Sequence, residues 1–472
     1  MPTNDQKCRH LLWRAAFGPS ADDLADSTHR KPEDLYAALR TASAPAPAYI
    51  DVTDAELRQL LEERADSGRM QDPDTRRMLR ARSREGIRAL NLTWLYQLIE
   101  SPAQLREKMA FFWHGHFAAR NQNLFHQQGL LDILRSHALG SFRTLLHEVS
   151  KSAAMLQFLN AQQNRKGQPN ENFAREVMEL FTMGRGNYTE GDIKEAARAF
   201  TGWSANFRGD FQFRRAAHDD GAKTVLGKTG PFAGEDVLNL LLDQKQTARH
   251  IAGKIYRFFV HETPDAARVD WLGDRFYKSD YNIQKLLDDL FTADWFYAGK
   301  NIGTRIKSPV ELLAGMQRLL PMKLENEEAL LLVQRLLGQV LFYPPNVAGW
   351  PGGRTWIDSS TLMTRMRLPL LLQDAGGLDL RPKTDDDTAG GQMEGSRGGR
   401  PISAQIEWGR FTKHFADVPR AGLMDRLAAT VLQVPLRVPA DSVSAFADAS
   451  ARDAFVRTAT LRLMALPEYQ MC

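Results

Sequence analysis

The sequence predicts a mainly α protein, a multi-helix array with a small extended or β-hairpin insert and rigid loops rich in proline, glycine and tryptophan. Three observations predict this fold. Apolar residues recur every three or four positions in long stretches of the chain, which is the pattern of amphipathic helices. Helix-opening and helix-ending residues separate these stretches. The alternation of apolar and other residues that is typical of strands is seen near residues 205–230.

The chain divides into three predicted parts. Residues 1–375 form the main helical domain, which carries the candidate site and includes the extended insert at about 205–230. Residues 376–401 contain three successive aspartates and many glycines, a composition that is typical of a flexible linker or loop. Residues 402–472 form a C-terminal helical segment that we expect to pack back on the main domain.

The first third of the chain is predicted as a series of helices. Residues 11–17 form a short helix that stops at a Gly-Pro pair. The leucine- and arginine-rich run 54–98 has helical spacing, with its charges on a solvated face. Residues 105–112 form a helix that we expect to end or loosen near Gly115, because glycine weakens a helix. An apolar helix follows over residues 142–159.

The helix predicted over residues 169–181 has two unlike faces, and the candidate site is organised around it. Its first residues, Pro169-Asn170, are good helix openers. At 100° per residue, its apolar side chains fall on one side and its glutamates cluster on another. The capping-box pattern Thr189-Glu190-Gly191-Asp192 then predicts the start of a second helix over residues 193–200.

The remainder alternates between loops and helices. Phenylalanines alternate with other residues over 207–213 and predict a hairpin or extended loop, and a glycine-punctuated polar turn follows over 217–227. Helices resume at residue 235 and run, with breaks, to about residue 341. Residues 342–356 are dense in proline, glycine and tryptophan, which predicts a rigid irregular loop.

Composition narrows the class of protein. The 61 basic and 57 acidic residues are spread along the chain, so we expect no nucleic-acid partner. The two cysteines stand near opposite ends, which argues against a disulfide framework or a cysteine metal site. No signal-peptide pattern and no run of about eighteen uncharged apolar residues occurs, so we expect no membrane span and a cytoplasmic location, with export alongside a partner left open. The oligomeric state is not predicted.

The first chemistry-bearing stretch holds His114 and His116. Spaced two apart, they would point the same way from an extended segment, and imidazoles suit metal binding or proton transfer near neutral pH. The alternative is that one histidine is hydrogen-bonded in the core and the other is exposed.

The second stretch holds Glu171, Glu176 and Glu179 with Arg175. Carboxylates at i and i+3 can bind a metal jointly, or separate into an acid and a base if burial raises the pKa of one. The alternative is an ordinary solvated helix, because Arg175 is spaced four residues from both Glu171 and Glu179, as in surface ion pairs.

The third stretch holds His218, Asp219 and Lys223 in the glycine-rich turn. Together they could supply a metal ligand, a carboxylate and a cation that binds a negative group of the substrate. The alternative is an ordinary polar loop. Trp203 and Trp350 would offer aromatic surfaces for stacking on sugar rings, although buried tryptophans are more often part of the core.

Seven blocks of sequence carry a resemblance to a known family, and they occur in its order. The blocks are Leu12 to Gly18, Trp113-His114-Gly115-His116-Phe117, Asn170 to Gly184, Tyr188-Thr189-Glu190, Ala196 to Trp203, His218-Asp219 with Lys223 to Gly227, and Pro345 to Pro351. The chain resembles, over nearly its whole length, the bacterial family catalogued as domain of unknown function 1800. The chain departs from the family pattern at Gly115, where members often have asparagine.

The resemblance implies which positions form a site, and it implies the activity only indirectly. Members are often encoded beside a second family that resembles alkaline phosphatases and sulfatases, which implies a sulfatase-like partner and work on an envelope or extracellular polymer. The resemblance also implies that the positions to examine are His114, His116, Asn170, Glu171, Arg175, Glu176, Glu179, His218 and Asp219.

We expect a hydrolase-type enzyme that acts on a glycan or cell-envelope polymer and uses a divalent metal ion. The predicted catalytic residues are Glu176, Glu179, Arg175 and Asp219, the substrate-binding residues Asn170, Lys223, Trp203 and Trp350, and the metal ligands His114, His116, His218 and Glu171. One alternative is a non-catalytic helical partner or maturation factor of the sulfatase-like protein. Another is a redox metalloprotein, because histidines and carboxylates on helices also build iron sites.

Overall fold

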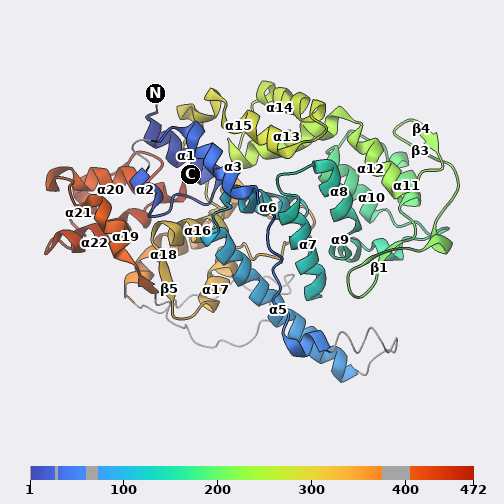
Figure 1. The fold of residues 1–472 in the computed structure, drawn as a ribbon, viewed down its shortest axis with the longest axis horizontal. Coiled ribbons are helices and arrows are strands. Elements are labelled where there is room, and N and C mark those ends of the chain that lie inside the picture. Colours follow the sequence, from blue (N-terminus) through green and yellow to red (C-terminus); the bar gives the residue numbers. More distant parts are fainter. Residues whose placement is uncertain (1, 27–29, 60–72, 375–403) are drawn as a thin grey trace.

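The computed structural model describes residues 2–26, 30–59, 73–374 and 404–472 and confirms a mainly α fold (Figure 1). Its α-helices up to residue 199 are α1 (Asn4–Ala15), α2 (Asp23–Asp26), α3 (Pro32–Ser43), α5 (Pro73–Glu100), α6 (Gln104–His116), α7 (Leu124–Ser136), α8 (Phe142–Lys151), α9 (Ala153–Phe158), α10 (Asn172–Glu176) and α11 (Glu190–Ala199). The later ones are α12 (Gly234–Leu242), α13 (Lys245–Phe259), α14 (Ala266–Lys278), α15 (Ile283–Phe291), α16 (Pro309–Leu319), α17 (Glu328–Leu336), α18 (Ser359–Asp374), α19 (Trp408–Thr412), α20 (Leu423–Val431), α21 (Ala440–Ser444) and α22 (Arg452–Met464).

Strands are short and antiparallel throughout the described residues. β1 (Trp203–Ala205) pairs with β2 (Phe211–Phe213), and β3 (Lys223–Val225) pairs with β4 (Lys228–Gly230). These two hairpins are the predicted insert near residues 205–230. A third pair joins β5 (Met322–Leu324) to β6 (Ala404–Ile406). The predicted linker, residues 376–401, lies outside the described residues.

The C-terminal segment contacts the start of the chain, and Figure 1 shows the two ends on the same side of the molecule. Arg305 and Cys472 exchange two backbone hydrogen bonds of 3.1 and 2.8 Å. The Arg14 guanidinium donates to the Cys472 carbonyl at 2.8 Å. The Lys307 ammonium lies between the Trp13 and Tyr469 rings, 3.7 and 3.6 Å from their centroids. These contacts tie three distant parts of the chain into one core.

Helix α6 lies in the middle of this core, and its buried charges are paired. Lys108 donates to Glu311 at 2.6 Å, and Arg135 donates to Glu107 at 2.9 Å. Burial alone would raise the pKa of Glu311, but Lys108 and Arg305 lower it to about 2. A buried charge needs such a partner because it has lost its hydration.

Several helices differ from their predicted form. The one helix predicted over residues 142–159 is two, α8 and α9, because the backbone of Ser152 between them is extended. Helix α6 continues through Gly115 to His116, and its neighbours Trp113, His114 and His116 are buried, so packing outweighs the low helix propensity of glycine. The helix predicted from Pro169 begins at Asn172 and becomes a π-helix over Val177–Thr182. The helix after it, α11, begins with the predicted capping box at Thr189.

None of the helices in the described ranges has the length and apolar character that crossing a lipid bilayer requires.

Candidate functional site

The π-helix carries Glu179, which is held in its ionised form by neighbours. The Tyr188 hydroxyl donates to Glu179 Oε2 at 2.7 Å, and the Arg185 guanidinium donates to Oε1 at 2.6 Å. The hydrogen bond from Tyr188, and then those from Arg185, lower the pKa of the Glu179 carboxyl. Glu179 is therefore an oriented carboxylate at neutral pH.

Glu176 lies one turn earlier and, unlike Glu179, is not held by neighbouring side chains. Its side chain is half-buried and has no hydrogen-bond or ion-pair partner among the described residues. Burial, and then the nearby charge of Glu179, raise the pKa of the Glu176 carboxyl. Two carboxyls three residues apart thus have pKa values shifted in opposite directions, which is the arrangement of an acid beside a base.

Arg175 connects the two helices of this region. Its guanidinium donates to Glu190 on α11 at 2.7 and 2.9 Å and to Glu171 at 3.1 Å. Asn170 lies in the loop before α10, where its side chain accepts from the Asn172 backbone N–H at 3.0 Å. Arg175 therefore fixes the position of α10 relative to α11, and Asn170 supports the start of α10.

The two histidines of the first stretch face different surroundings. His114 Nε2 accepts from the Phe342 backbone N–H at 3.1 Å, and its ring lies 5.1 Å from the Trp94 ring and 5.3 Å from that of Trp350. Burial lowers the pKa of His114 to about 3. The half-buried Trp350 belongs to the loop that follows α17 and covers this histidine.

His116 lies instead at the carbonyl end of the π-helix. Its Nε2 is 3.3 Å from the Phe181 carbonyl, and its Nδ1 is 3.1 Å from the Lys254 ammonium of α13. Lys254 also donates to the Leu180 carbonyl at 2.9 Å. Burial, and then Arg257, lower the pKa of Lys254 to about 8. Burial and Lys254 hold the pKa of His116 well below its usual range, so His116 is neutral.

The third stretch forms a separate polar cluster beside α11. His218 Nδ1 lies 2.9 Å from the Thr201 carbonyl. Arg198 donates to Asp219 at 2.8 Å and, as the main cause, lowers the pKa of that carboxyl to about 2. The Lys223 ammonium donates to the Asp219 and Gly221 carbonyls at 2.5 and 2.9 Å. Lys223 therefore holds the turn together.

Trp203 contacts both α10 and the end of α11 through apolar packing. Its ring is buried, 6.1 Å from the Phe173 ring of α10 and 5.1 Å from the Phe200 ring that ends α11. It packs between the two elements.

The four predicted metal ligands have separate partners. His114 contacts Phe342, His116 contacts Lys254, His218 contacts Thr201, and Glu171 contacts Arg175. Within the described ranges, no group of three or more histidine, cysteine, aspartate or glutamate side chains is placed to hold a metal ion. These residues do not fit one shared centre as they are arranged, and the metal site stays a prediction.

The three predicted stretches meet only in part. The first and second meet where His116 contacts the π-helix. The second and third both bond to α11, through Arg175–Glu190 and Asp219–Arg198. In the described structure, no hydrogen bond or ion pair joins Glu176 or Glu179 to His114, His116, His218 or Asp219. The carboxylate pair is therefore the candidate site, and the two histidine clusters lie around its helix.

Four residues of this region were not predicted as site residues from the sequence: Arg185, Tyr188, His250 and Lys254, of which Tyr188 lies in one of the seven blocks. Gln246, His250 and Lys254 are spaced four apart on α13, and all three approach the carbonyl end of the π-helix. Such a polar stripe at helical spacing is a signal that sequence reasoning can use.

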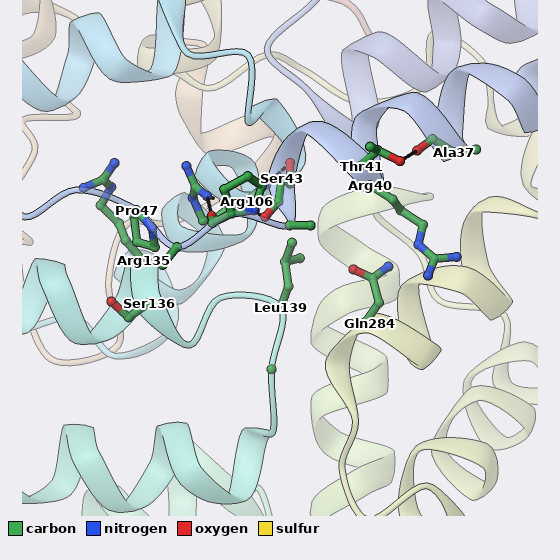
Figure 2. A pocket seen from close by; sticks show the side chains of 14 residues that line it. Ala37, Arg40, Thr41, Ser43, Pro47, Arg106, Arg135, Ser136, Leu139 and Gln284 are labelled. Carbon is green, nitrogen blue, oxygen red and sulfur yellow. Dashed lines mark hydrogen bonds between the residues drawn. The ribbon is translucent and has the colours of Figure 1, made fainter.

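A cavity of about 560 Å³ lies away from this region, between α3, α6, α7 and α15 (Figure 2). Arg106 and Arg135 lie on one side of it, and Arg40 lies beside Gln284 on the other. The three guanidinium groups bond to protein: Arg106 to the Pro45 carbonyl, Arg135 to Glu107 and the Ala48 carbonyl, and Arg40 to Asp288.

Comparison with known proteins gives a family. No curated protein matches the chain, and no solved structure matches it. The sequence profile of one family matches residues 10–471 of the 472. It is the family that the seven blocks resemble. The chain therefore belongs to the family described as Protein of unknown function (DUF1800).

Proposed function

We propose that the protein is a hydrolase-type enzyme that acts on a glycan or cell-envelope polymer, with Glu176 as its general acid. The observation that carries this proposal is the pair of opposite pKa shifts on Glu176 and Glu179. A carboxyl whose pKa is raised, beside one whose pKa is lowered, matches the two proton-transfer roles that cleavage of a glycosidic bond requires. The polymer class is supported by the family resemblance.

In the proposed reaction, Glu176 donates its proton to the leaving-group oxygen as the scissile bond breaks. Glu179, fixed by Tyr188 and Arg185, takes a proton from the attacking water or stabilises positive charge that develops on the substrate. Arg175 acts as a positioning residue because its guanidinium is already bonded to Glu171 and Glu190.

No step in this proposal passes through a metal ion, because the predicted ligands have separate partners. Metal analysis of the purified protein tests the predicted site directly. Stoichiometric zinc, calcium or magnesium that is lost in His116→Gln would support it, and stoichiometric iron would instead favour the redox alternative.

The proposal is tested by release of soluble or reducing products from a panel of peptidoglycan and neutral and acidic polysaccharides. Glu176→Gln is expected to lower the rate by about 10²- to 10⁴-fold, the usual contribution of general acid catalysis. Glu148→Gln, an exposed glutamate on α8, is the matched control and should leave the rate unchanged. Equal rates for Glu176→Gln and the native protein would rule out the assigned role.

The pH profile gives a second test. Because the acid must be protonated, the rate should fall as pH rises above the raised pKa of Glu176. If no polymer is cleaved and the sulfatase-like partner binds Glu176→Gln as well as the native protein, the non-catalytic alternative is favoured.

A further inference from the structure

A second cleft, of about 550 Å³, lies between α13 and the beginning of α14. Both helices are at the top of Figure 1. Its charged and polar walls come from Gln246, Arg249, His250 and Arg257 on α13, while Ala266 and Val269 of α14 form the facing wall. Among the described residues, no acidic side chain lines the cleft. Its lining is therefore cationic on one side and apolar on the other.

The positive charge of this cleft is only partly balanced. Arg249 is paired with Asp270 at 2.6 Å. Arg257 is exposed and has no ion-pair or hydrogen-bond partner in the described part of the chain. It is close enough to His250 and Lys254 to lower the pKa of both. Within residues 73–374 and the other described ranges, Lys254 also has no ion-pair partner, so Arg257 and Lys254 together leave positive charge that no carboxylate balances.

The end of the cleft near Asn187, Gln246 and His250 is held by hydrogen bonds and close packing. The Gln246 amide donates to the Met183 carbonyl at 3.1 Å. The Asn187 amide, which also lines the cleft, donates to the Met183 and Gly184 carbonyls at 3.0 and 3.2 Å. A side chain at position 184 would come within 2.6 Å of His250 Nδ1, so the glycine there allows the imidazole to pack closely. The walls are preorganised, and the Arg257 guanidinium keeps its donors free.

We propose that this cleft binds the oxyanion group of a small ligand, a phosphate or a carboxylate, with Arg257 as its main contact. A guanidinium offers paired N–H donors that match two oxygens of either group. The cavity in Figure 2 differs in this respect, because its three arginines already bond to carbonyls and carboxylates. The proposal does not depend on hydrolase activity.

The test is calorimetric titration of the full-length protein with inorganic phosphate and, separately, with acetate, at constant ionic strength. Saturable binding is expected for at least one of them. Arg257→Gln should weaken it by tenfold or more. Arg275→Gln removes the same charge from α14 at a site bonded to Asp289, outside the cleft, and should leave binding unchanged.

A second variant, Ala266→Glu, places a carboxylate at the exposed first residue of α14. Acidic residues are favourable in a first helical turn, so this variant should fold. The new carboxylate would pair with the cationic wall and is also expected to weaken binding by tenfold or more.

The tighter of the two anions identifies the ligand group, and either result supports the site. Absence of saturable binding with both anions would overturn the proposal. So would an equal loss in Arg257→Gln and Arg275→Gln, because this would show a general charge effect and no local contact. Since the readout is binding, its failure is distinct from failure of the proposed hydrolysis.

Discussion

Glu176, the proposed general acid, illustrates how a catalytic role could oppose stability. Its folded pKa is raised above the unfolded value, so ionising it in the folded protein is unfavourable. Stability from this group is present below the unfolded pKa and is lost as pH rises through the folded pKa. An active site commonly keeps such a group in spite of its effect on folding.

Replacing Glu176 by glutamine is therefore expected to stabilise the protein at pH 7. The gain should be on the order of 0.5 kcal/mol, since the side chain is only half-buried and solvent screens its charge. Urea unfolding measures it, with Glu148→Gln as the control. The gain should shrink below about pH 4, where the native carboxyl is protonated in both states. A destabilised Glu176→Gln at pH 7 would show that the carboxylate has a partner after all.

Tyr188 is expected to set the charge of Glu179. Tyr188→Phe removes the hydrogen bond that contributes most to the lowered pKa of the Glu179 carboxyl, so this pKa should rise towards its usual value. Because a depressed pKa supplies stability that is lost as pH falls, acid unfolding of the variant should begin at a higher pH. Carbon-13 NMR titration of the Glu179 carboxyl measures the change. Tyr277→Phe, whose hydroxyl bonds to the Asp243 carbonyl, should not change it.

At the scale of elements, Gly115 and Gly349 are in contact, and only the first has space for a side chain. A side chain at Gly115, near the end of α6, would meet no atom within 4 Å. Gly349 has φ of +81°, and a side chain there would come within 2.3 Å of the Gly115 carbonyl. The loop over 342–352 can pack on α6 because position 349 has no side chain.

Gly115→Ala should therefore stabilise the protein by about 0.5 to 1 kcal/mol, because alanine favours the helix and meets open space. Gly349→Ala should destabilise it by more than about 1 kcal/mol through strain and overlap. Thermal unfolding of the two variants, measured side by side, checks both signs. Equal shifts in the unfolding temperature of the two variants would show that the loop is not closely packed on α6.

The π-helix is the element that the sequence did not predict. Thr182 donates its hydroxyl to the Val177 carbonyl at 2.7 Å, and Met183 donates its backbone N–H to the Met178 carbonyl at 3.0 Å. The Leu180 and Phe181 carbonyls then contact Lys254 and His116. Such turns are frequent at functional sites, and no residue pattern in a helix of ordinary spacing marks them.

At the scale of the whole molecule, the buried ion pair between Lys108 and Glu311 joins α6 to α16. Removing one partner leaves the other charge buried without compensation. The pair links residues that are 203 positions apart, so it stabilises the tertiary arrangement more than either helix.

Glu311→Gln is expected to lower the free energy of unfolding by about 3 to 5 kcal/mol. Asp243→Asn, which removes an exposed ion pair with Lys228, should lower it by less than about 1 kcal/mol. Chemical denaturation compares the two. Since the folded pKa of Glu311 is about 2, the contribution of this pair should be lost as pH falls from about 4.5 towards 2. Similar effects for both variants would contradict the importance of burial.

The sequence by itself determined the mainly α character, the extended insert near residues 205–230, the Thr189 capping box and the family resemblance, because helical spacing, caps and turns are local patterns. It also placed Glu176 and Glu179 on one helix. Only the tertiary structure decided that Glu176 lacks a partner while Glu179 has two, that His114 and His116 face different surroundings, and that Arg257 borders an unbalanced cleft. The pKa of a carboxyl and the direction of a side chain depend on residues distant in the chain, and local spacing does not specify those contacts.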